Sequence, residues 1–369
     1  MTPPLRVGLD GRAFDSPAAG VRRYVRDLVP ALLALGEPLE LVALGGQSAC
    51  LPDGMSYVEE PPHPAGNPGW VIVGLPRAAA RARVDVIHAP AYTAPFWAGV
   101  PVVLTIHDVS YARQPQWYPH QRDWLRRAFY RRSARAATRI LTDSAFSADE
   151  IHAAYRIPHA RITVAPLGVA PRFWSSASSA AAVLPDGVRQ PFALHVGDLH
   201  ERRNLPLLVA AVLQARLRVP TLSLVLAGTD RGVANHVASI AVRAGVPEAV
   251  LMLGAVSDHA LTALYRDAAV LTYPSRYEGF GLPVLEAMAG GTPVIAARAA
   301  SVPEVLGEAG ILLDPDDTGG WADAIVAVVT DDDRRARMRE AGRTRAAAFT
   351  WARTARATFD VYRSAAQRV

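Results

Sequence analysis

The chain has 369 residues, half of them hydrophobic and a fifth charged, which predicts a globular protein of about two domains and excludes a disordered one. The net charge is +5 and all 39 basic residues are arginines, which excludes a P-loop and a Schiff-base lysine, because both need lysine. A single cysteine, Cys50, excludes an internal disulfide and favours a reducing cytoplasm. We expect neither a signal peptide nor a membrane span, since no apolar run reaches about 18 residues.

Short apolar runs alternate with amphipathic segments, which favours parallel sheets with helices on both faces. The first expected strands are residues 5–9, 39–44, 84–88, 102–106, 140–143 and 162–165. A second series comprises residues 192–196, 222–227, 250–253, 270–273 and 294–296. Helices are expected at residues 21–35, 205–217, 258–266 and 349–366. We expect Trp351, Phe359 and Tyr362 of the last helix to pack on the N-terminal half.

Residues 169–190 combine a Ser/Ala run with a Pro-Asp-Gly turn, which indicates a domain boundary. The expected organisation is an N-terminal domain of residues 1–170, a linker of residues 171–190, a C-terminal domain of residues 191–347 and a helix of residues 348–369 that returns to the N-terminal domain. In open parallel sheets ligands bind beyond the carboxyl ends of the strands. We therefore expect the chemistry in loops that follow strands.

Residues 274–293 form the most informative loop, directly after an expected strand. Gly279 and Gly281 allow a tight turn and close backbone approach, and a helix is expected to begin near Leu282. A glycine-rich loop that leads into a helix N-terminus offers free N–H groups to an anion. A diphosphate would fit there.

Two carboxylates and two arginines accompany this loop. Ionised Glu278 and Glu286 would accept hydrogen bonds from a hydroxyl-rich ligand, although Glu278 as a helix cap and Glu286 on a solvated face are the structural alternatives. Arg202 and Arg203 follow another expected strand and would neutralise a leaving diphosphate, the alternative being a surface pair. Asn204 is expected to cap the next helix.

The string Glu278-Gly-Phe-Gly-Leu-Pro-Val-Leu-Glu286 resembles the E-x7-E signature of the retaining glycosyltransferases of family four. Other similar segments extend over nearly the whole chain: the first glycine loop at residues 20–24, His107-Asp108, Ser144 with Ser147, the phosphate loop at residues 197–204, residues 254–264, Glu304 and Phe349-Thr-Trp351. Arg203 departs from the family, which usually has lysine there. The resemblance implies an α/β, GT-B fold, in which two Rossmann-like parallel-sheet domains face each other across a cleft, with acceptor bound by the first and nucleotide sugar by the second.

The resemblance also implies the reaction. It is the retaining, metal-independent transfer of a hexose from a nucleoside-diphosphate sugar to a saccharide or lipid-linked acceptor in cell-surface glycan synthesis, with no further cofactor. A Pro-x-Trp segment at Pro115 loosely resembles bacterial mannosyltransferases and favours GDP-mannose, while UDP-glucose and UDP-N-acetylglucosamine stay open. The implied catalytic residues are His107 and Glu278, and Asp108 is expected to orient a loop. The implied donor-binding residues are Gly20, Arg202, Arg203, Glu278, Gly279, Phe280, Gly281, Leu282 and Glu286.

Three other functions were weighed. A nucleotide-sugar epimerase on the same fold would bind the same donor without an acceptor. A nucleic-acid-binding protein is suggested by the sequence pI of 9.6, but no DNA or RNA motif occurs, so we expect no nucleic acid as partner. The third is a sugar-binding relative without turnover. Two D-x-D spellings, at residues 314–316 and 331–333, are expected to be turns or helix caps and not metal sites.

Residues 121–139, from Gln121 to Arg139, contain seven arginines and one acid. Apolar residues lie roughly along one face of the expected helix: Trp124, Leu125, Ala128, Phe129 and Ala136. One interpretation is a basic amphipathic helix that rests on anionic lipid and would place the enzyme peripherally at the inner face of a membrane. The other is an ordinary helix whose apolar face lies in the core.

Overall fold

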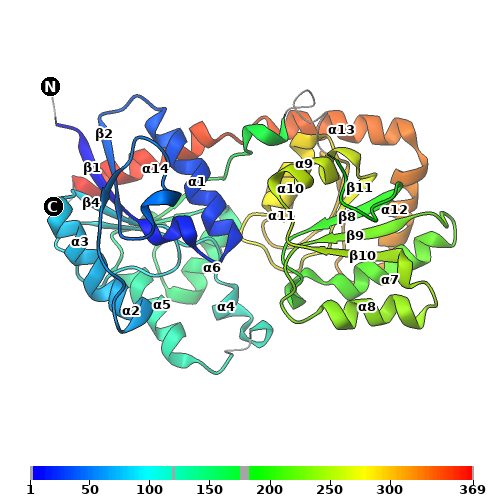
Figure 1. Cartoon of the computed structure of the whole chain (residues 1–369), viewed down its shortest axis with the longest axis horizontal. Coiled ribbons are helices and arrows are strands. Elements are labelled where there is room, and N and C mark those ends of the chain that lie inside the picture. Colours follow the sequence, from blue (N-terminus) through cyan, green and yellow to red (C-terminus); the bar gives the residue numbers. More distant parts are fainter. Residues whose placement is uncertain (1–2, 119–120, 175–182, 368–369) are drawn as a thin grey trace. The chain divides into compact units, whose positions relative to one another are not determined.

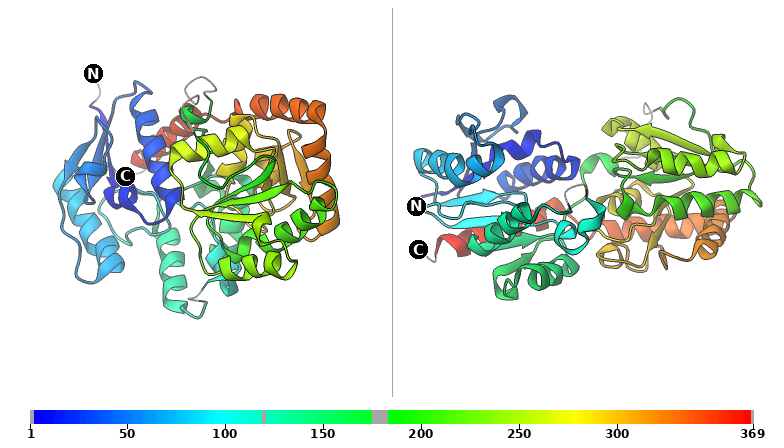
Figure 2. Two further views of the ribbon diagram at one scale, coloured as in Figure 1. Left: turned by 45° about the vertical axis from the view of Figure 1, so that its right-hand side comes forward. Right: turned by 90° about the horizontal axis from the view of Figure 1, so that it is seen from below.

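The computed structural model describes residues 3–118, 121–174 and 183–367 and divides into two compact units (Figures 1 and 2). The first unit comprises Met1–Gly168 together with Thr350–Val369, and the second comprises Val169–Phe349. Each unit is built on one parallel sheet. Residues 175–182 of the expected linker lie outside the described residues, whereas Phe173, which was also expected in the linker, packs within the second unit against Tyr265.

Seven strands form the sheet of the first unit in the order β3-β2-β1-β4-β5-β6-β7. They are β1 (Leu5–Asp10), β2 (Leu39–Leu44), β3 (Ser56–Val58), β4 (Val86–Ala89), β5 (Val102–Thr105), β6 (Arg139–Thr142) and β7 (Ile162–Val164). All neighbours pair in parallel, which requires a crossover connection between successive strands. Helices supply most of these crossovers.

Helices cover both faces of this sheet (Figures 1 and 2). They are α1 (Ala19–Leu33), α2 (Gly66–Gly69), α3 (Leu75–Ala82), α4 (Ser110–Arg113), α5 (Trp124–Ala136), α6 (Ala145–Tyr155) and α14 (Trp351–Ala366). One core cluster joins α3, α5 and α6 to strand residues that include Ile87 and Ala89 of β4. His88 lies between these two residues and therefore points to the opposite face, where α1 and α14 pack against each other.

Helix α14 completes the first unit although it comes last in the sequence. The Tyr362 hydroxyl hydrogen-bonds with His88 Nδ1 at 2.7 Å, and Thr354 Oγ1 donates to the Pro166 carbonyl at 2.6 Å. The ring of Trp351 lies 6.3 Å from that of Tyr24 on α1. These contacts confirm that the final helix packs on the N-terminal half.

Six parallel strands form the sheet of the second unit in the order β10-β9-β8-β11-β12-β13. They are β8 (Phe192–Val196), β9 (Ser223–Ala227), β10 (Val250–Gly254), β11 (Val270–Tyr273), β12 (Val294–Ala297) and β13 (Ile311–Leu313). The surrounding helices are α7 (Leu205–Arg216), α8 (Ala234–Arg243), α9 (Asp258–Asp267), α10 (Leu282–Gly290), α11 (Val302–Leu306), α12 (Thr318–Thr330) and α13 (Asp332–Ala346). One core cluster holds α7, α8 and α12, and α9 and α10 lie over the other face (Figure 1).

Strand order reverses once in each sheet, between β1 and β4 in the first unit and between β8 and β11 in the second. In open α/β sheets the crevice beyond the carboxyl ends of the strands at such a point is the usual ligand site. The loops that follow these four strands are therefore the places where function is expected.

Two predictions about local structure were wrong. Asn204 precedes α7 but does not cap it, because its left-handed backbone (φ 55°) directs the side chain to the Pro315 carbonyl, which accepts from Nδ2 at 2.7 Å. Trp124 and Leu125 were assigned to the buried face of α5 in the core interpretation, but they are 65% and 62% exposed.

Within the described residues, no helix has the length and apolar character to cross a bilayer.

Candidate active site

The loops after β8 and β11 meet at the strand-order reversal of the second unit. The first carries a 3₁₀ helix, η8 (Glu201–Arg203), and the second leads through Glu278 into α10. The amide of Arg276 donates to the Arg202 carbonyl at 2.9 Å and ties the two loops together. This backbone contact brings the predicted arginines and Glu278 to one place.

Arg203 is a buried cation beneath these loops, with only 7% of the residue exposed. Its guanidinium donates to Glu278, to the Tyr273 hydroxyl and, at 3.2 Å, to Ser275 Oγ. A Cβ at Gly197 would lie 3.1 Å from Arg203 Nη2, so a glycine makes room for the side chain. The surface-pair alternative is wrong for Arg203, which is a fixed charge inside the unit.

Arg202 faces outward more than Arg203, with 20% of its side chain exposed. Its Nη1 donates to the Tyr277 carbonyl at 2.8 Å and to Glu278 Oε2 at 3.1 Å. One buried carboxylate therefore serves two guanidinium groups. With Arg202, Arg203 and Glu278 all ionised, this cluster carries a net charge of +1.

The positive charge of the cluster lowers the pKa of two nearby histidines. Burial and, to a smaller extent, the charge of Arg203 lower the pKa of His195 on β8 to about 3. Burial also lowers the pKa of His200, followed by the charges of Arg202 and Arg203. A positive site that exists before the ligand arrives suits charge that develops on a leaving diphosphate.

The N-terminus of α10 is adjacent to this cluster. Gly281 precedes the helix with φ of 100°, a conformation that favours glycine, and Leu282 is the first helical residue. Gly279 is buried, and Phe280 packs edge-on against Phe349 with 5.9 Å between ring centroids. The expected turn and helix start are both present. Pro283 has no N–H, and the Val284 amide donates to the Gly281 carbonyl at 2.9 Å. The positive end of the helix dipole at Leu282 is therefore the feature of α10 that suits an anion.

Glu286 lies one turn inside α10 and is 1% exposed. The Tyr265 hydroxyl, on α9, donates to Glu286 Oε2 at 2.9 Å. A solvated face is therefore wrong for Glu286. The capping alternative is wrong for Glu278, because Gly281 holds the cap position and no side chain caps the helix.

His107 follows β5 in the first unit and has an acceptor at each ring nitrogen. Nδ1 lies 2.8 Å from Asp143 Oδ2, and Nε2 lies 3.2 Å from the Pro90 carbonyl. Burial alone would lower the pKa of His107, but the Asp143 carboxylate outweighs it and the pKa is raised. Two acceptors and a raised pKa both favour the imidazolium.

The loop around His107 is held by its polar neighbours. Asp108 Oδ1 accepts from the amide and hydroxyl of Ser110 at 2.9 and 2.6 Å, which confirms that Asp108 orients a loop. Ser144 Oγ caps α6 by accepting from the Ser147 amide, and Ser147 Oγ donates to the His107 carbonyl at 3.1 Å. The serines predicted from the motif therefore position His107.

Gly20 is the second residue of α1, also in the first unit. It is exposed, and a Cβ added there would meet nothing within 4 Å. Its approach to a diphosphate stays a prediction.

The two D-x-D spellings are a turn and a cap, as expected. Asp314 Oδ1 accepts from the Asp316 amide at 2.8 Å, and Asp331 caps α13 by accepting from the Arg334 amide at 2.8 Å. In the described part of the chain, no three His, Cys, Asp or Glu side chains gather in a way that could hold a metal ion.

Two family models match the chain in succession. Glycosyltransferase Family 4 matches residues 18–173, and Glycosyl transferases group 1 matches residues 181–345. O-antigen chain mannosyltransferase B of Escherichia coli is 31% identical over 376 residues, which cover 94% of this chain and 96% of that enzyme. The chain is a family 4 glycosyltransferase. The family is not one of epimerases, and we do not retain that alternative.

Solved structures agree on the GT-B fold of this glycosyltransferase. Sucrose-phosphate synthase from Thermosynechococcus elongatus superposes with a TM-score of 0.77 at 22% identity and covers 98% of this chain and 99% of its own. An Anabaena protein in complex with UDP and glucose superposes with a TM-score of 0.72 at 17% identity and covers 97% of this chain and 99% of its own.

The sequence missed the partners of the predicted residues. Asp143 ends an expected strand next to the one that leads to His107, and two polar residues at neighbouring strand ends were the available signal. Tyr273 and Ser275 lie beside the predicted glutamate, but nothing in their spacing pointed to Arg203, about 70 residues earlier.

Proposed function

We propose that this glycosyltransferase moves a mannosyl group from GDP-mannose to a saccharide or lipid-linked acceptor in cell-surface glycan synthesis, with retention of anomeric configuration and without a metal. The observation that carries the proposal is the cluster of Arg202, Arg203 and Glu278 beside the N-terminus of α10. The mannosyltransferase among the relatives favours mannose. The Anabaena structure with UDP and glucose supports UDP-glucose as the second candidate donor.

The cluster supplies charge where the reaction needs it. As the bond between the sugar and the diphosphate breaks, negative charge grows on the departing phosphate. Arg202 and the positive end of the α10 dipole are placed to receive that charge, while Arg203 and Glu278 hold Arg202 in position. The acceptor hydroxyl attacks the anomeric carbon on the face that the phosphate leaves, and a phosphate oxygen takes its proton.

His107 is the second proposed catalytic residue. Asp143 holds its ring, and the raised pKa favours the charged form. An imidazolium can donate a hydrogen bond to a sugar or phosphate oxygen that gains negative charge. We propose that Arg202 and Arg203 take the part that a divalent cation plays in metal-dependent transferases.

A thermal-shift panel tests the donor. GDP, UDP, ADP, GDP-mannose and UDP-glucose are each added with magnesium and with EDTA, since a ligand that binds only the folded protein raises the melting midpoint. We expect a selective shift with the guanine nucleotides that is equal in both conditions. A rise in the melting midpoint with uracil nucleotides alone would show that the donor is not GDP-mannose and favour UDP-glucose. A rise that EDTA abolishes would contradict metal independence.

Arg202→Ala tests the site. Because Arg202 is partly exposed, we expect the fold to survive and nucleotide affinity to fall roughly tenfold or more, as for loss of a charge-assisted hydrogen bond. Arg218→Ala is the matched control, since it breaks an exposed arginine pair with Asp323 in the same unit. Equal nucleotide affinity in both variants would refute the site.

Retention is tested on the product. With GDP-α-mannose and a saccharide acceptor, a retaining enzyme gives an α-linkage, which the anomeric one-bond carbon–proton coupling in NMR distinguishes from a β-linkage. A β-linked product would overturn the proposed stereochemistry.

A basic aromatic patch on the first unit supports peripheral contact with an anionic membrane. Trp97, Trp124 and Leu125 are 73%, 65% and 62% exposed, and the guanidinium of Arg132 on α5 lies 5.5 Å from the Trp97 ring centroid. Residues 121–139 also contain five exposed arginines, namely Arg122, Arg126, Arg131, Arg132 and Arg135, and one acid, Asp123. Exposed tryptophans beside arginines suit the interface of an anionic bilayer.

Vesicle sedimentation tests this contact. We expect binding to phosphatidylcholine vesicles that contain phosphatidylglycerol, weakened by salt, and loss of binding in Arg126→Glu/Arg127→Glu and in Trp124→Ala/Leu125→Ala. Arg218→Glu/Arg243→Glu, on the second unit, is the charge-matched control. Equal binding by all variants would exclude the patch.

A further inference from the structure

A pocket of about 790 Å³ opens at the strand-order reversal of the first unit, and nothing above assigns it. Asp10, the last residue of β1, and Pro90, directly after β4, both line it. All its lining residues belong to the first unit. Its position follows the general rule for ligand sites of open α/β sheets, and its size suits a small molecule.

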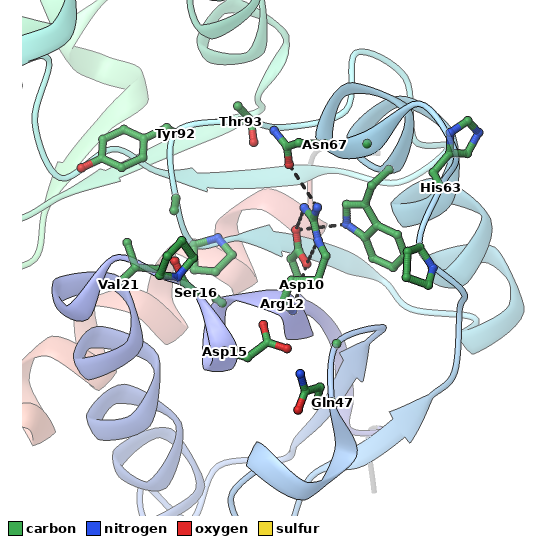
Figure 3. A pocket seen from close by; sticks show the side chains of 18 of the residues that line it. Asp10, Arg12, Asp15, Ser16, Val21, Gln47, His63, Asn67, Tyr92 and Thr93 are labelled. Atoms are coloured by element: carbon green, nitrogen blue, oxygen red, sulfur yellow. Dashed lines mark hydrogen bonds and ion pairs between the residues drawn. The ribbon is translucent and has the colours of Figure 1, made fainter. Parts of the chain in front are cut away.

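Arg12 is the one arginine of the pocket lining, and protein groups already neutralise it. Asp10 accepts from its Nε at 3.0 Å and from its Nη2 at 2.6 Å, and Asn67 Oδ1 accepts from its Nη1 at 3.0 Å. The guanidinium lies 4.7 Å from the Trp70 ring centroid, and Trp70 Nε1 donates to the same Asp10 at 3.2 Å. Figure 3 shows Arg12 between Asp10 and Asn67. Arg12 is therefore held in place in the pocket wall, and its charge is already compensated by Asp10, so it would attract an anionic ligand only weakly.

Three other polar side chains are available to a ligand. Asp15 and Gln47 lie on one side of Arg12, and Thr93 lies on the other (Figure 3). Within residues 3–118, 121–174 and 183–367, none of these three side chains is hydrogen-bonded to another residue. A carboxylate, an amide and a hydroxyl together accept and donate, which matches the alternating demands of sugar hydroxyl groups.

The charge of the lining disfavours phosphate. Asp10 is paired with Arg12, and Glu60 is paired with Arg81 at 2.7 Å. Among the described residues, Asp15 is the lining carboxylate that is not paired with a cation, so the lining keeps an excess of one negative charge. A phosphate monoester would meet this excess of negative charge, whereas a neutral polyol would not.

The pocket adjoins the proposed catalytic histidine. His107 Nε2 lies 3.2 Å from the carbonyl of Pro90, and its ring centroid lies 6.0 Å from that of Tyr92. Pro90 and Tyr92 both line the pocket, and Tyr92 stacks on Tyr130 with 6.2 Å between centroids. These two tyrosines give the pocket an apolar wall beside its polar groups, as sugar rings require, since they carry both C–H faces and hydroxyls.

We propose that this pocket binds the acceptor as a neutral sugar unit and that Asp15 makes it discriminate against a sugar unit bearing a phosphate monoester. The assignment of the bound sugar as acceptor rests on the proposed function. The binding preference itself does not, because it is measured without a donor.

The test is saturation-transfer NMR titration of the full chain with no nucleotide present. The probes are the methyl glycosides of mannose, glucose, galactose and N-acetylglucosamine, and the 6-phosphate of each. We expect at least one neutral glycoside to bind, with its phosphate about tenfold weaker or worse. Failure of all four neutral glycosides to bind, or tighter binding of the phosphates, would overturn the proposal.

Variants assign the preference to Asp15. Asp15→Asn should weaken neutral binding several-fold and narrow the gap to the phosphate, and Asp15→Arg should favour the phosphate about tenfold. Asp149→Asn is the control, an exposed carboxylate on α6 of the same unit. Unchanged preferences in both Asp15 variants, with circular dichroism like that of the wild type, would also overturn the proposal.

The same samples separate this inference from the proposed function. Asp15 variants should keep the nucleotide-induced thermal shift, and Arg202→Ala should keep glycoside binding. Glycoside binding without any nucleotide-induced thermal shift would refute the proposed nucleotide-sugar site and support the proposed sugar pocket. A nucleotide-induced thermal shift without glycoside binding would support the nucleotide-sugar site and refute the sugar pocket.

Discussion

Glu278 holds two guanidinium groups from a nearly buried position, and this defines its role. It is 5% exposed, and its carboxylate accepts from Arg202 and from Arg203. A carboxylate in this position neutralises the buried Arg203 and leaves Arg202 as the net charge of the site. In this arrangement Glu278 would act on the proposed diphosphate through the arginines.

Glu278→Gln should therefore damage both folding and binding. It leaves buried Arg203 without its counter-charge, which costs roughly 3 kcal/mol in the free energy of unfolding. Nucleotide affinity should fall as well, because Arg202 loses its anchor. Denaturant unfolding and nucleotide titration measure the two effects, with Asp323→Asn, an exposed arginine partner, as control. Full stability combined with lost turnover would assign the carboxylate to the substrate instead.

The His107–Asp143 pair predicts a pH dependence of stability. A histidine whose folded pKa is raised stabilises the fold fully below its unfolded pKa of about 6.5, and this contribution is lost as pH rises through the folded value. The stability gap between wild type and His107→Gln should thus be larger near pH 6 than near pH 9. Urea unfolding at both values measures it, with exposed His159→Gln as control. A constant gap would show that Asp143 does not stabilise the imidazolium of His107 in the folded protein.

At the scale of elements, the start of α10 depends on one backbone conformation. Gly281 has φ of 100°, but a Cβ there would meet nothing closer than 3.9 Å. The strain of a substitution is therefore conformational and not steric.

Gly281→Ala should cost roughly 1–2 kcal/mol in the free energy of unfolding and weaken nucleotide binding, because the N-terminus of α10 changes direction. Gly20→Ala is the control for the stability measurement alone. That glycine lies in α1 with open space around it, so alanine should stabilise the protein by about 0.5–1 kcal/mol. A loss of less than about 0.5 kcal/mol in Gly281→Ala would mean that α10 can begin without the left-handed residue.

Element prediction worked where the pattern was long and failed where tertiary contacts decide. The buried central strands were readable from their apolar runs, because both faces of a parallel sheet are covered. The strands β3 and β13 have three residues each and were not predicted, whereas β7, which is as short and also lies at a sheet edge, was predicted from its apolar run. The exposure of Trp124 and Leu125 could not be read, because an apolar side chain on a helix is usually buried.

In the candidate site too, local features were predictable from the sequence and tertiary contacts were not. Arg202, Glu278 and Gly281 were identified through their motif, and local rules predicted the turn and the helix start that the structure contains. The burial of Arg203 and the hydrogen bond from Tyr265 to Glu286 depend on packing between distant segments, which no local spacing encodes.

At the scale of the whole molecule, a fully buried histidine lies in each unit, His88 in the first and His195 in the second, and each stays neutral. Burial lowers the pKa of His88 in the first unit and of His195 in the second to about 3. Because the pKa of each histidine is lower in the folded protein, the unfolded chain binds protons at pH values where the folded chain does not. The free energy of unfolding therefore decreases as pH falls below about 6.5.

Each of these histidines should contribute a stability loss of about 1.4 kcal/mol per pH unit between roughly pH 6 and pH 4. Replacement of His195 by Asn should flatten this slope for the second unit, as followed by guanidinium unfolding at several pH values. The same exposed His159→Gln variant should leave the slope unchanged. An unaltered slope in His195→Asn would mean that the acid loss comes from carboxylates.

Helix α14 has a consequence for how the chain is made. The ribosome releases the strands of the first unit early, but the helix that covers His88 and Tyr24 follows the entire second unit. During synthesis the first unit must therefore wait with one sheet face covered by α1 but not yet by α14, while the second unit, continuous in sequence, can finish folding. A nascent chain would acquire its nucleotide site before its first sheet is closed, and the incompletely covered face is where a chaperone would be needed.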